Sequence, residues 1–485
     1  MRKTLLFFLF TFYLISAKGQ SLIDIIEKSE KAIFETRSYI TDGPSKGTAS
    51  GFFISPDGLA ITSASIFENA DSAAIILRNG RDYKIERILS VHPYTNLALI
   101  KVEQNRQKQF EYLIPSKQSY RVEEEALVFN HLDDSADGSD LITVKEIAYF
   151  PFISRTGIIN GMISPKSNGA PAINYRGEVF GIVKSVVESN QQIVYNTYLL
   201  NDSNWIDINT RLRDVPNLEN KKLLLGAEKS RSISHIITEN FVESARIISR
   251  YIKEDPSNAE AYSIRAYARH KYKNNVGSRA DLSKCYELDA DYFLQFYFQG
   301  LFLLEKNEKR EALINFELCN SRQPTFAPAI VRMTMLKLAN SKNIRTAYRQ
   351  LSEAVLHDSL EAGAFYERAR LRMQHSADRE ATLDDINQTI YLDPSYAGIF
   401  TLRGIIKSEK EDMLGAISDF DKAIEKDKND THAYFNRGIA NYNIGLKKEA
   451  CQDWNKAGEL GNFKAYNYIS RYCKDMNKGL YPSGY

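Results

Sequence analysis

Imidazoles, which carry out acid–base chemistry near neutral pH, are few in the first half of the chain. His92 approaches a predicted strand, His131 precedes the acidic pair Asp133 and Asp134, and Ser167 lies in the segment 164–183. A serine, an imidazole and a carboxylate together perform acyl transfer, because the imidazole takes the serine proton and the carboxylate orients the imidazole. No HExxH, CxxC or other paired ligand spacing occurs, so the sequence predicts neither a metal site nor a cofactor.

The elements that would position these side chains are strands. Between residues 22 and 205, short apolar or alternating runs are separated by turn signals such as Pro-Asp-Gly at 56–58 and Asn-Gly at 79–80. Many short strands with regular turns are typical of an all-β barrel or sandwich. The apolar spacing over residues 22–36 predicts one helix that precedes these strands.

Two segments of this region carry the pattern of a known family. Gly47–Val102 reads GTASGFFISPDGLAITSASIFENADSAAIILRNGRDYKIERILSVHPYTNLALIKV, and Ser164–Val183 reads SPKSNGAPAINYRGEVFGIV. In order, spacing and turn residues these segments resemble the trypsin-like serine proteases, especially the Deg/HtrA branch. The resemblance implies a chymotrypsin-like double β-barrel over residues 20–210, in which two six-stranded antiparallel barrels flank a cleft.

The same resemblance marks the three positions of the family's catalytic triad. The base histidine is replaced by Ser65, the orienting aspartate by Asn96 and the nucleophilic serine by Asn168. A hydroxyl is no base near neutral pH, and the carboxamide nitrogen is a poor nucleophile because its lone pair is delocalised. In a worked triad, loss of the serine or the histidine alone lowers the rate by about 10⁶. The resemblance therefore implies a degenerate triad and no catalytic residue.

Residues near these three positions supply no evident substitute for the family's catalytic side chains. Lys166 and Ala170 replace family glycines of the oxyanion loop, so the geometry of its donors is altered. Ser167 could replace the nucleophile only after a one-residue slip of this loop. We interpret His92 and His131 as surface or hydrogen-bonded histidines rather than as bases.

From about residue 222 the pattern becomes helical and repeats every 34–35 residues. A small residue, a bulky residue three positions earlier and a second small residue recur together: Cys285, Cys319, Ala354, Thr389, Ala423, Ala457; Leu282, Phe316, Leu351, Ile386, Phe420, Trp454; and Ala266, Gly300, Met335, Ala369, Gly404, Gly438. This resembles the tetratricopeptide repeat (TPR), whose units bury their apolar faces only against neighbours. It implies an all-α TPR solenoid over 223–474 with about six to seven repeats and a capping helix, after a linker at 211–222 and before a tail at 475–485.

All four cysteines lie in this helical half. Cys285 and Cys319 occupy the small-residue register, where we interpret them as small hydrophobic side chains. If helices over 447–459 and 463–473 form an antiparallel hairpin, Cys451 faces Cys473. These two form a possible disulfide that would pin the end of the solenoid in an oxidising compartment; the alternative is that both stay free thiols.

The first nineteen residues have the pattern of a signal peptide. Two basic residues precede a thirteen-residue apolar run, Leu5 to Ala17, which is too short to cross a bilayer as a helix. Small residues at Ala17 and Gly19 fit cleavage before Gln20, and a retained membrane anchor is the alternative. The formal net charge is +2, or −1 without the three basic residues of the leader, so charge gives no case for nucleic acid or an anionic membrane as a partner.

These patterns predict a periplasmic or secreted pseudoprotease fused to a TPR scaffold. The non-catalytic β-domain would keep its fold, and the concave face of the TPR solenoid would bind protein or peptide partners, with no membrane span in the mature form. The first alternative is an active serine-type endopeptidase with rearranged catalytic residues. A second alternative makes the β-domain a structural support for the helices.

Overall fold

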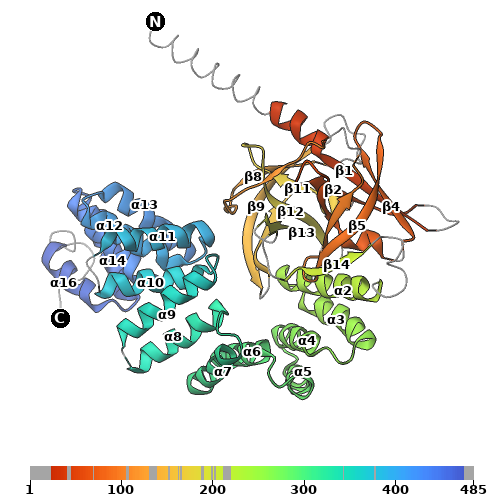
Figure 1. Cartoon of the computed structure of the whole chain (residues 1–485). Coiled ribbons are helices and arrows are strands. Elements are labelled where there is room, and N and C mark those ends of the chain that lie inside the picture. Colours follow the sequence, from red (N-terminus) through yellow and green to blue (C-terminus); the bar gives the residue numbers. More distant parts are fainter. Residues whose placement is uncertain are drawn as a thin grey trace, which may run out of the picture. The chain divides into compact units, whose positions relative to one another are not determined.

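Strands in the first half of the chain form two closed antiparallel barrels (Figure 1). The computed structural model describes residues 23–40, 45–68, 70–104, 109–129, 139–150, 153–161, 163, 167–186, 191–197, 200, 204–210, 220–341, 343–375 and 378–473. The predicted signal peptide, the tail at 475–485, most of the predicted linker, His131 and Lys166 lie outside these residues. The chain divides into two compact units, Met1–Phe298 and Gln299–Tyr485, which are described separately.

The first barrel is closed by the pairing of its two end strands. Its order is β5-β4-β1-β2-β3-β6, and β5 also pairs with β6, while β14 extends the sheet along β5. Phe34, Phe53 and Ile100 are buried in its core. The strands are β1 Ile33–Tyr39, β2 Ser45–Phe53, β3 Leu59–Ser63, β4 Ser72–Leu77, β5 Asp82–His92, β6 Leu97–Val102 and β14 Ile206–Thr210.

The second barrel has the same construction. Its order is β11-β8-β9-β10-β13-β12, closed by the pairing of β11 with β12, and the short β7 lies parallel to β12. Tyr120, Val144 and Phe180 are buried in its core. The strands are β7 Ile114–Pro115, β8 Glu125–Phe129, β9 Ser139–Phe150, β10 Ile153–Asn160, β11 Pro171–Ile173, β12 Glu178–Val186 and β13 Gln191–Asn196. The predicted chymotrypsin-like double barrel is confirmed.

The predicted opening helix over 22–36 is wrong at its end. The helix covers residues 23–32, and strand β1 begins at Ile33. Residues of β1 pair with β2 on one side and with β4 on the other, so Ile33 and Phe34 are buried in the sheet. Pairing on both edges outweighs the helical spacing that Ile33 contributes to the sequence pattern.

The second half of the chain is helical, as the repeat pattern predicts. Asparagine or aspartate side chains accept a hydrogen bond from a first-turn backbone N–H at the start of α3, α4, α5, α9, α11, α13 and α14, which satisfies donors that a helix end leaves unpaired. The helices are α2 Asn220–Ile237, α3 Phe241–Glu254, α4 Ala259–Lys271, α5 Asn275–Leu288, α6 Phe293–Glu305, α7 Lys309–Arg322, α8 Ala327–Ser341, α9 Ile344–His357, α10 Ala362–His375, α11 Arg379–Leu392, α12 Ala397–Glu409, α13 Met413–Lys426, α14 Thr431–Asn443, α15 Lys447–Glu459 and α16 Phe463–Tyr472. The fold class, a double barrel followed by an all-α TPR-like solenoid, is confirmed.

Within a repeat, the small residue of the first helix packs against the bulky residue of the second. At Gly404, an added Cβ would lie 2.6 Å from the ring of Phe420, and at Gly300 it would lie 2.7 Å from Phe316. These distances are far below van der Waals contact, so the glycines are needed for the close approach of the two helices. Cys285 and Cys319 are free and fully buried in the small register, which confirms their interpretation as core side chains.

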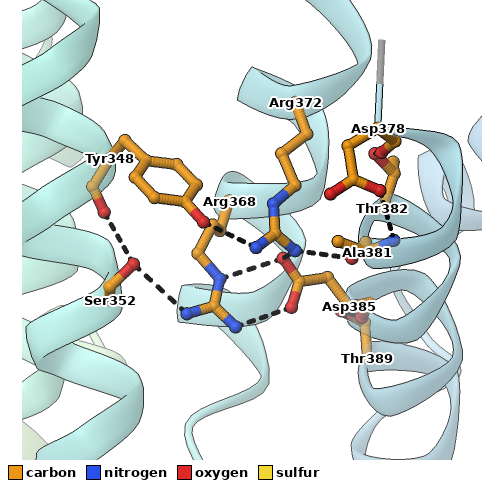
Figure 2. A network of polar contacts seen from close by, with 9 residues as sticks. All are labelled: Tyr348, Ser352, Arg368, Arg372, Asp378, Ala381, Thr382, Asp385 and Thr389. Carbon is orange, nitrogen blue, oxygen red and sulfur yellow. Dashed lines mark hydrogen bonds and ion pairs between the residues drawn. The ribbon is translucent and has the colours of Figure 1, made fainter. Parts of the chain in front are cut away.

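A buried ion pair between arginine and aspartate links the two helices of most repeats. Figure 2 shows one of them: Arg368 donates two hydrogen bonds to Asp385, of 2.9 and 2.7 Å, and Arg372 donates a third of 2.7 Å. The same pair recurs as Arg265–Asp281, Arg403–Asp419 and Arg437–Asp453. In two units the register is neutral, with Gln299 and Asn315 or with Thr334 and Gln350.

The last helix closes the solenoid through a disulfide. Cys451 of α15 and Cys473, which follows α16, lie with their sulfur atoms 2.04 Å apart and their Cα atoms 5.9 Å apart. Trp454 packs between Tyr442, Tyr468 and Tyr472 beside this bond. Among the described helices, none is both long enough and apolar enough to span a membrane.

Candidate functional site

The three positions that the sequence assigns to a triad lie on the wall of one cavity of about 390 Å³. Ser65 is in the 3₁₀ helix η1, Ala64–Phe67, which follows β3, whereas Asn96 directly precedes β6. A hydrogen bond of 2.8 Å from the backbone N–H of Ala64 to the carbonyl oxygen of Asn96 joins these two segments. Asn168 lies in the turn before β11 and faces them from the other barrel.

The side chains of Ser65 and Asn168 are held by neutral hydrogen bonds. The hydroxyl of Ser65 lies 2.9 Å from that of Ser63, and Oδ1 of Asn168 accepts a 2.7 Å hydrogen bond from the backbone N–H of Ser185. Asn96 adopts a positive φ of 58°, a conformation that asparagine tolerates better than most residues. A hydroxyl and two carboxamides are therefore the functional groups at the three positions that the resemblance assigns to the triad.

The turn that contains Asn168 keeps one glycine for a steric reason. Gly169 has a φ of +87°, and a Cβ there would lie 2.5 Å from the carbonyl oxygen of Ser50. Ala170 is fully buried, and its N–H donates a 2.8 Å hydrogen bond to the carbonyl of Ser167. Ser167 itself is fully buried and is not among the described residues that line the cavity.

Two imidazoles lie near the cavity. His92 is fully buried, with Nδ1 3.0 Å from the hydroxyl of Thr95 and its ring packed against Tyr94 and Trp205. It is thus the hydrogen-bonded histidine that the sequence predicts, and the Thr95 hydroxyl it contacts does reach the cavity wall. His235 was not singled out from the sequence, yet it is fully buried and lines the same cavity from α2.

Helix α2 lines the same cavity as the three triad positions. Its contribution is Ala227, Glu228, Arg231, Ser234 and His235. The sequence pattern assigns these residues to the repeats and does not indicate that they reach the cleft. A pattern of residues along the chain does not show which helix packs against a strand some forty residues earlier.

The comparisons with known proteins agree with this architecture. Residues 49–182 match the model of the trypsin-like peptidase domain. The chain is 28% identical over 144 residues to a probable periplasmic serine endoprotease, DegP-like, of Halomonas elongata, covering 28% of this chain and 29% of that protein. It is 27% identical over 151 residues to human tetratricopeptide repeat protein 13, covering 30% of this chain and 17% of that one.

A third relative aligns over a longer stretch. It is the DnaJ homolog subfamily C member 7 homolog of Dictyostelium discoideum, 23% identical over 307 residues, which are 59% of this chain and 54% of the relative. The chain thus spans at most about half the length of these curated relatives. Together, these matches and the helical region show a trypsin-like domain fused to TPR-like helices.

Solved protease structures resemble the β-domain at low sequence identity. The active form of the Rv3671c protease from M. tuberculosis is 15% identical, with a TM-score of 0.30 over 36% of this chain and 79% of that one. The serine endoprotease from Yersinia pestis is 15% identical, with a TM-score of 0.31 over 36% of this chain and 62% of that one. The assignment of the double barrel stands on its strand pairing rather than on these scores.

Proposed function

We propose that this chain is an exported, non-catalytic protease-like protein whose helical repeats bind protein or peptide partners. One observation carries the proposal: three triad positions meet at a single cavity and present a hydroxyl and two carboxamides. None of these groups accepts a proton near neutral pH, so a general base is absent from all three positions. The TPR-like relatives support protein binding, because stacked helical repeats form extended binding surfaces.

The non-catalytic assignment is tested with fluorescent casein. The purified full chain is expected to release no fluorescence above buffer, and the Ser167→Ala variant is expected to behave identically. Cleavage by the full chain that disappears in Ser167→Ala would contradict the proposal, because it would make the serine beside Asn168 the nucleophile.

Export is tested by cell fractionation. A leader with a short apolar core and the periplasmic relative support an extracytoplasmic location. The protein recovered from the periplasm or medium is expected to begin at Gln20. Recovery of the chain in the cytoplasm with residues 1–19 intact would contradict export.

Partner binding is tested by capture from an envelope extract. The full chain is expected to retain a defined protein, and binding is expected to fail when exposed side chains of the helices from α8 onward are replaced by glutamate. Equal capture by a chain with those replacements would place the binding site outside helices α8 to α16.

A rearranged hydrolase is the second candidate function, and the position of His235 favours it. This imidazole lines the same cavity as the hydroxyls of Ser63, Ser65 and Ser185. An imidazole that activates a serine is a general base whose activity rises with pH as the ring loses its proton. Esterase activity with that pH profile, abolished in His235→Gln and kept in His92→Gln, would establish this candidate and refute the non-catalytic one.

A further inference from the structure

Helix α2 is buried on more than one side, which is unusual for the first helix of a repeat stack. From Lys229 to Thr238 every residue except Arg231 is buried, although four of them are serine or histidine. A surface helix would show one apolar stripe and one polar, solvated face. Burial all round means that the helix has a neighbour on each side.

One neighbour is the cleft between the barrels. Ala227, Ser230, Arg231 and Ser234 follow the spacing i, i+3, i+4, i+7 and so share one face of α2. Lys184 of β12 donates a 2.5 Å hydrogen bond from Nζ to the hydroxyl of Ser230, and the hydroxyls of Tyr195 of β13 and Ser234 lie 3.2 Å apart. The helix also contacts η1, the element that carries Ser65, and β9. The small side chains of this face let the helix approach the barrels closely.

The other neighbour is the repeat stack. Ser232 donates a 3.1 Å hydrogen bond to the carbonyl oxygen of Ser244 in α3, and Ile233 and Ile236 are buried beside it. Terminal repeats of a solenoid usually present a polar outer face to water. Here the outer face of the first helix is covered by protein instead.

A buried ionic network fixes this arrangement. Nζ of Lys229 in α2 lies 2.5 Å from Oε2 of Glu260 in α4, and the hydroxyl of Tyr94, from the barrel segment before Asn96, donates a 2.7 Å hydrogen bond to Oε1 of the same glutamate. The carboxylate of Glu260 in α4 therefore binds one neighbouring helix, α2, and the barrel. Its partners are all largely buried, so the contact is specific rather than a surface ion pair.

Aromatic side chains extend the contact along the stack. Phe150, at the end of β9, lies 5.9 Å from Tyr267 of α4 and 6.3 Å from Phe298 of α6, measured between ring centroids. The double barrel thus touches α2, α4 and residue Phe298 of α6. These are the first helices of three successive helix pairs.

We propose that the cleft between the barrels takes α2 of the same chain as its occupant, and that the protease-like domain serves as the N-terminal cap of the repeat stack. A peptide in trans then competes with a tethered helix for the cleft. Because a short tether gives an effective concentration of about 1 mM, α2 outcompetes a peptide at about 10 µM by about 100-fold at equal intrinsic affinity. Partner binding is left to the helices beyond this contact. The proposal is independent of whether the cavity is catalytic.

The test is photo-crosslinking in the full chain. Ser65 is exposed at the cavity wall and is replaced by benzoylphenylalanine; the matched control carries the same replacement at Tyr175, an exposed aromatic position in the turn between β11 and β12. Irradiation is done with fluorescein-labelled casein peptide present at about 10 µM, the concentration used above. The Ser65 probe is expected to form its crosslinks with residues of α2, and the Tyr175 probe to form none with α2.

A second variant shows that the crosslink reports docking. Ser234→Trp inserts a large side chain between α2 and β13, whereas Ser321→Trp places the same side chain at an exposed position of α7. The crosslink to α2 is expected to fall at least tenfold in Ser234→Trp and to be unchanged in Ser321→Trp. Crosslinking of the Ser65 probe to the casein peptide in place of α2, in the otherwise unaltered chain, would overturn the proposal. That result would leave the non-catalytic assignment untouched, because binding without cleavage is consistent with it.

Discussion

Removing one buried carboxylate should weaken the repeat stack far more than removing its neutral counterpart. The Asp385→Ala variant takes away the acceptor of three hydrogen bonds from two guanidinium groups (Figure 2). The side chain of Asp385 is 3% exposed and that of Arg368 is 14% exposed, so water does not replace the lost charge freely. Breaking a buried pair by deleting one partner costs about 3–5 kcal/mol.

The surroundings place the expected loss at the lower end of that range. Arg372 keeps a 2.6 Å hydrogen bond to the hydroxyl of Tyr348, and Arg368 keeps a 3.3 Å hydrogen bond to Ser352. We therefore expect a loss of about 3 kcal/mol. With an m-value of about 2 kcal/mol/M in urea, the midpoint of unfolding of this unit should fall by about 1.5 M.

The assay is urea unfolding of the full chain in a Trp205→Phe background, followed by far-UV circular dichroism and by the fluorescence of Trp454, which is buried in the same compact unit as Asp385. The matched control is Asn315→Ala, the same register in a unit without the ion pair, where a loss of no more than about 1 kcal/mol is expected. Equal midpoints for Asp385→Ala and Asn315→Ala would refute the reasoning, because the buried charge would then contribute nothing beyond its volume.

Three further predictions concern the helical repeats. Burial raises the pKa of both Cys285 and Cys319 to about 12, so neither thiol should react with Ellman's reagent at pH 8 in the native protein. In denaturant, two thiols per chain should react. Four reactive thiols would mean that the disulfide between Cys451 and Cys473 is absent. Burial, together with a nearby aspartate, raises the pKa of Glu361 to about 7, so the folded state favours its protonated form. The free energy of unfolding should therefore fall as the pH rises from about 4.5 to 7. In Glu361→Gln the urea midpoint should depend less steeply on pH, and an unchanged dependence would contradict the assignment. Gly404→Ala should lower the melting temperature, because its Cβ would lie 2.6 Å from a phenylalanine ring, while Gly226→Ala, with open space around it, should raise it slightly; the opposite order would contradict the packing account.

The sequence predicts the repeats well because their periodicity is local. A small residue such as Gly404 and a bulky one such as Phe420 recur at fixed spacing, and that spacing alone places them in contact. The double barrel could be inferred from turn residues and short alternating strands. The resemblance to a family also located Ser65, Asn96 and Asn168, which the structure brings to one cavity.

What the sequence could not supply is contact between distant elements. The residue pattern of the helix that carries His235 does not indicate contact with the cleft. The packing of α2 onto the barrels brings this residue to the cavity. The length of the opening helix was misjudged for a related reason, because Ile33 fits a helical stripe but is drawn into a strand that pairs on both edges. Long-range pairing decides such cases, and a window of sequence does not contain it.

Active-site labelling tests the proposal that the protease-like domain carries no activated nucleophile. The purified full chain is incubated with a fluorophosphonate probe, which bonds covalently to a serine only when a neighbouring base has activated it. We expect labelling no greater than that of the heat-denatured protein. Stoichiometric labelling of one serine in the cavity wall, mapped by mass spectrometry and lost in His235→Gln, would contradict it.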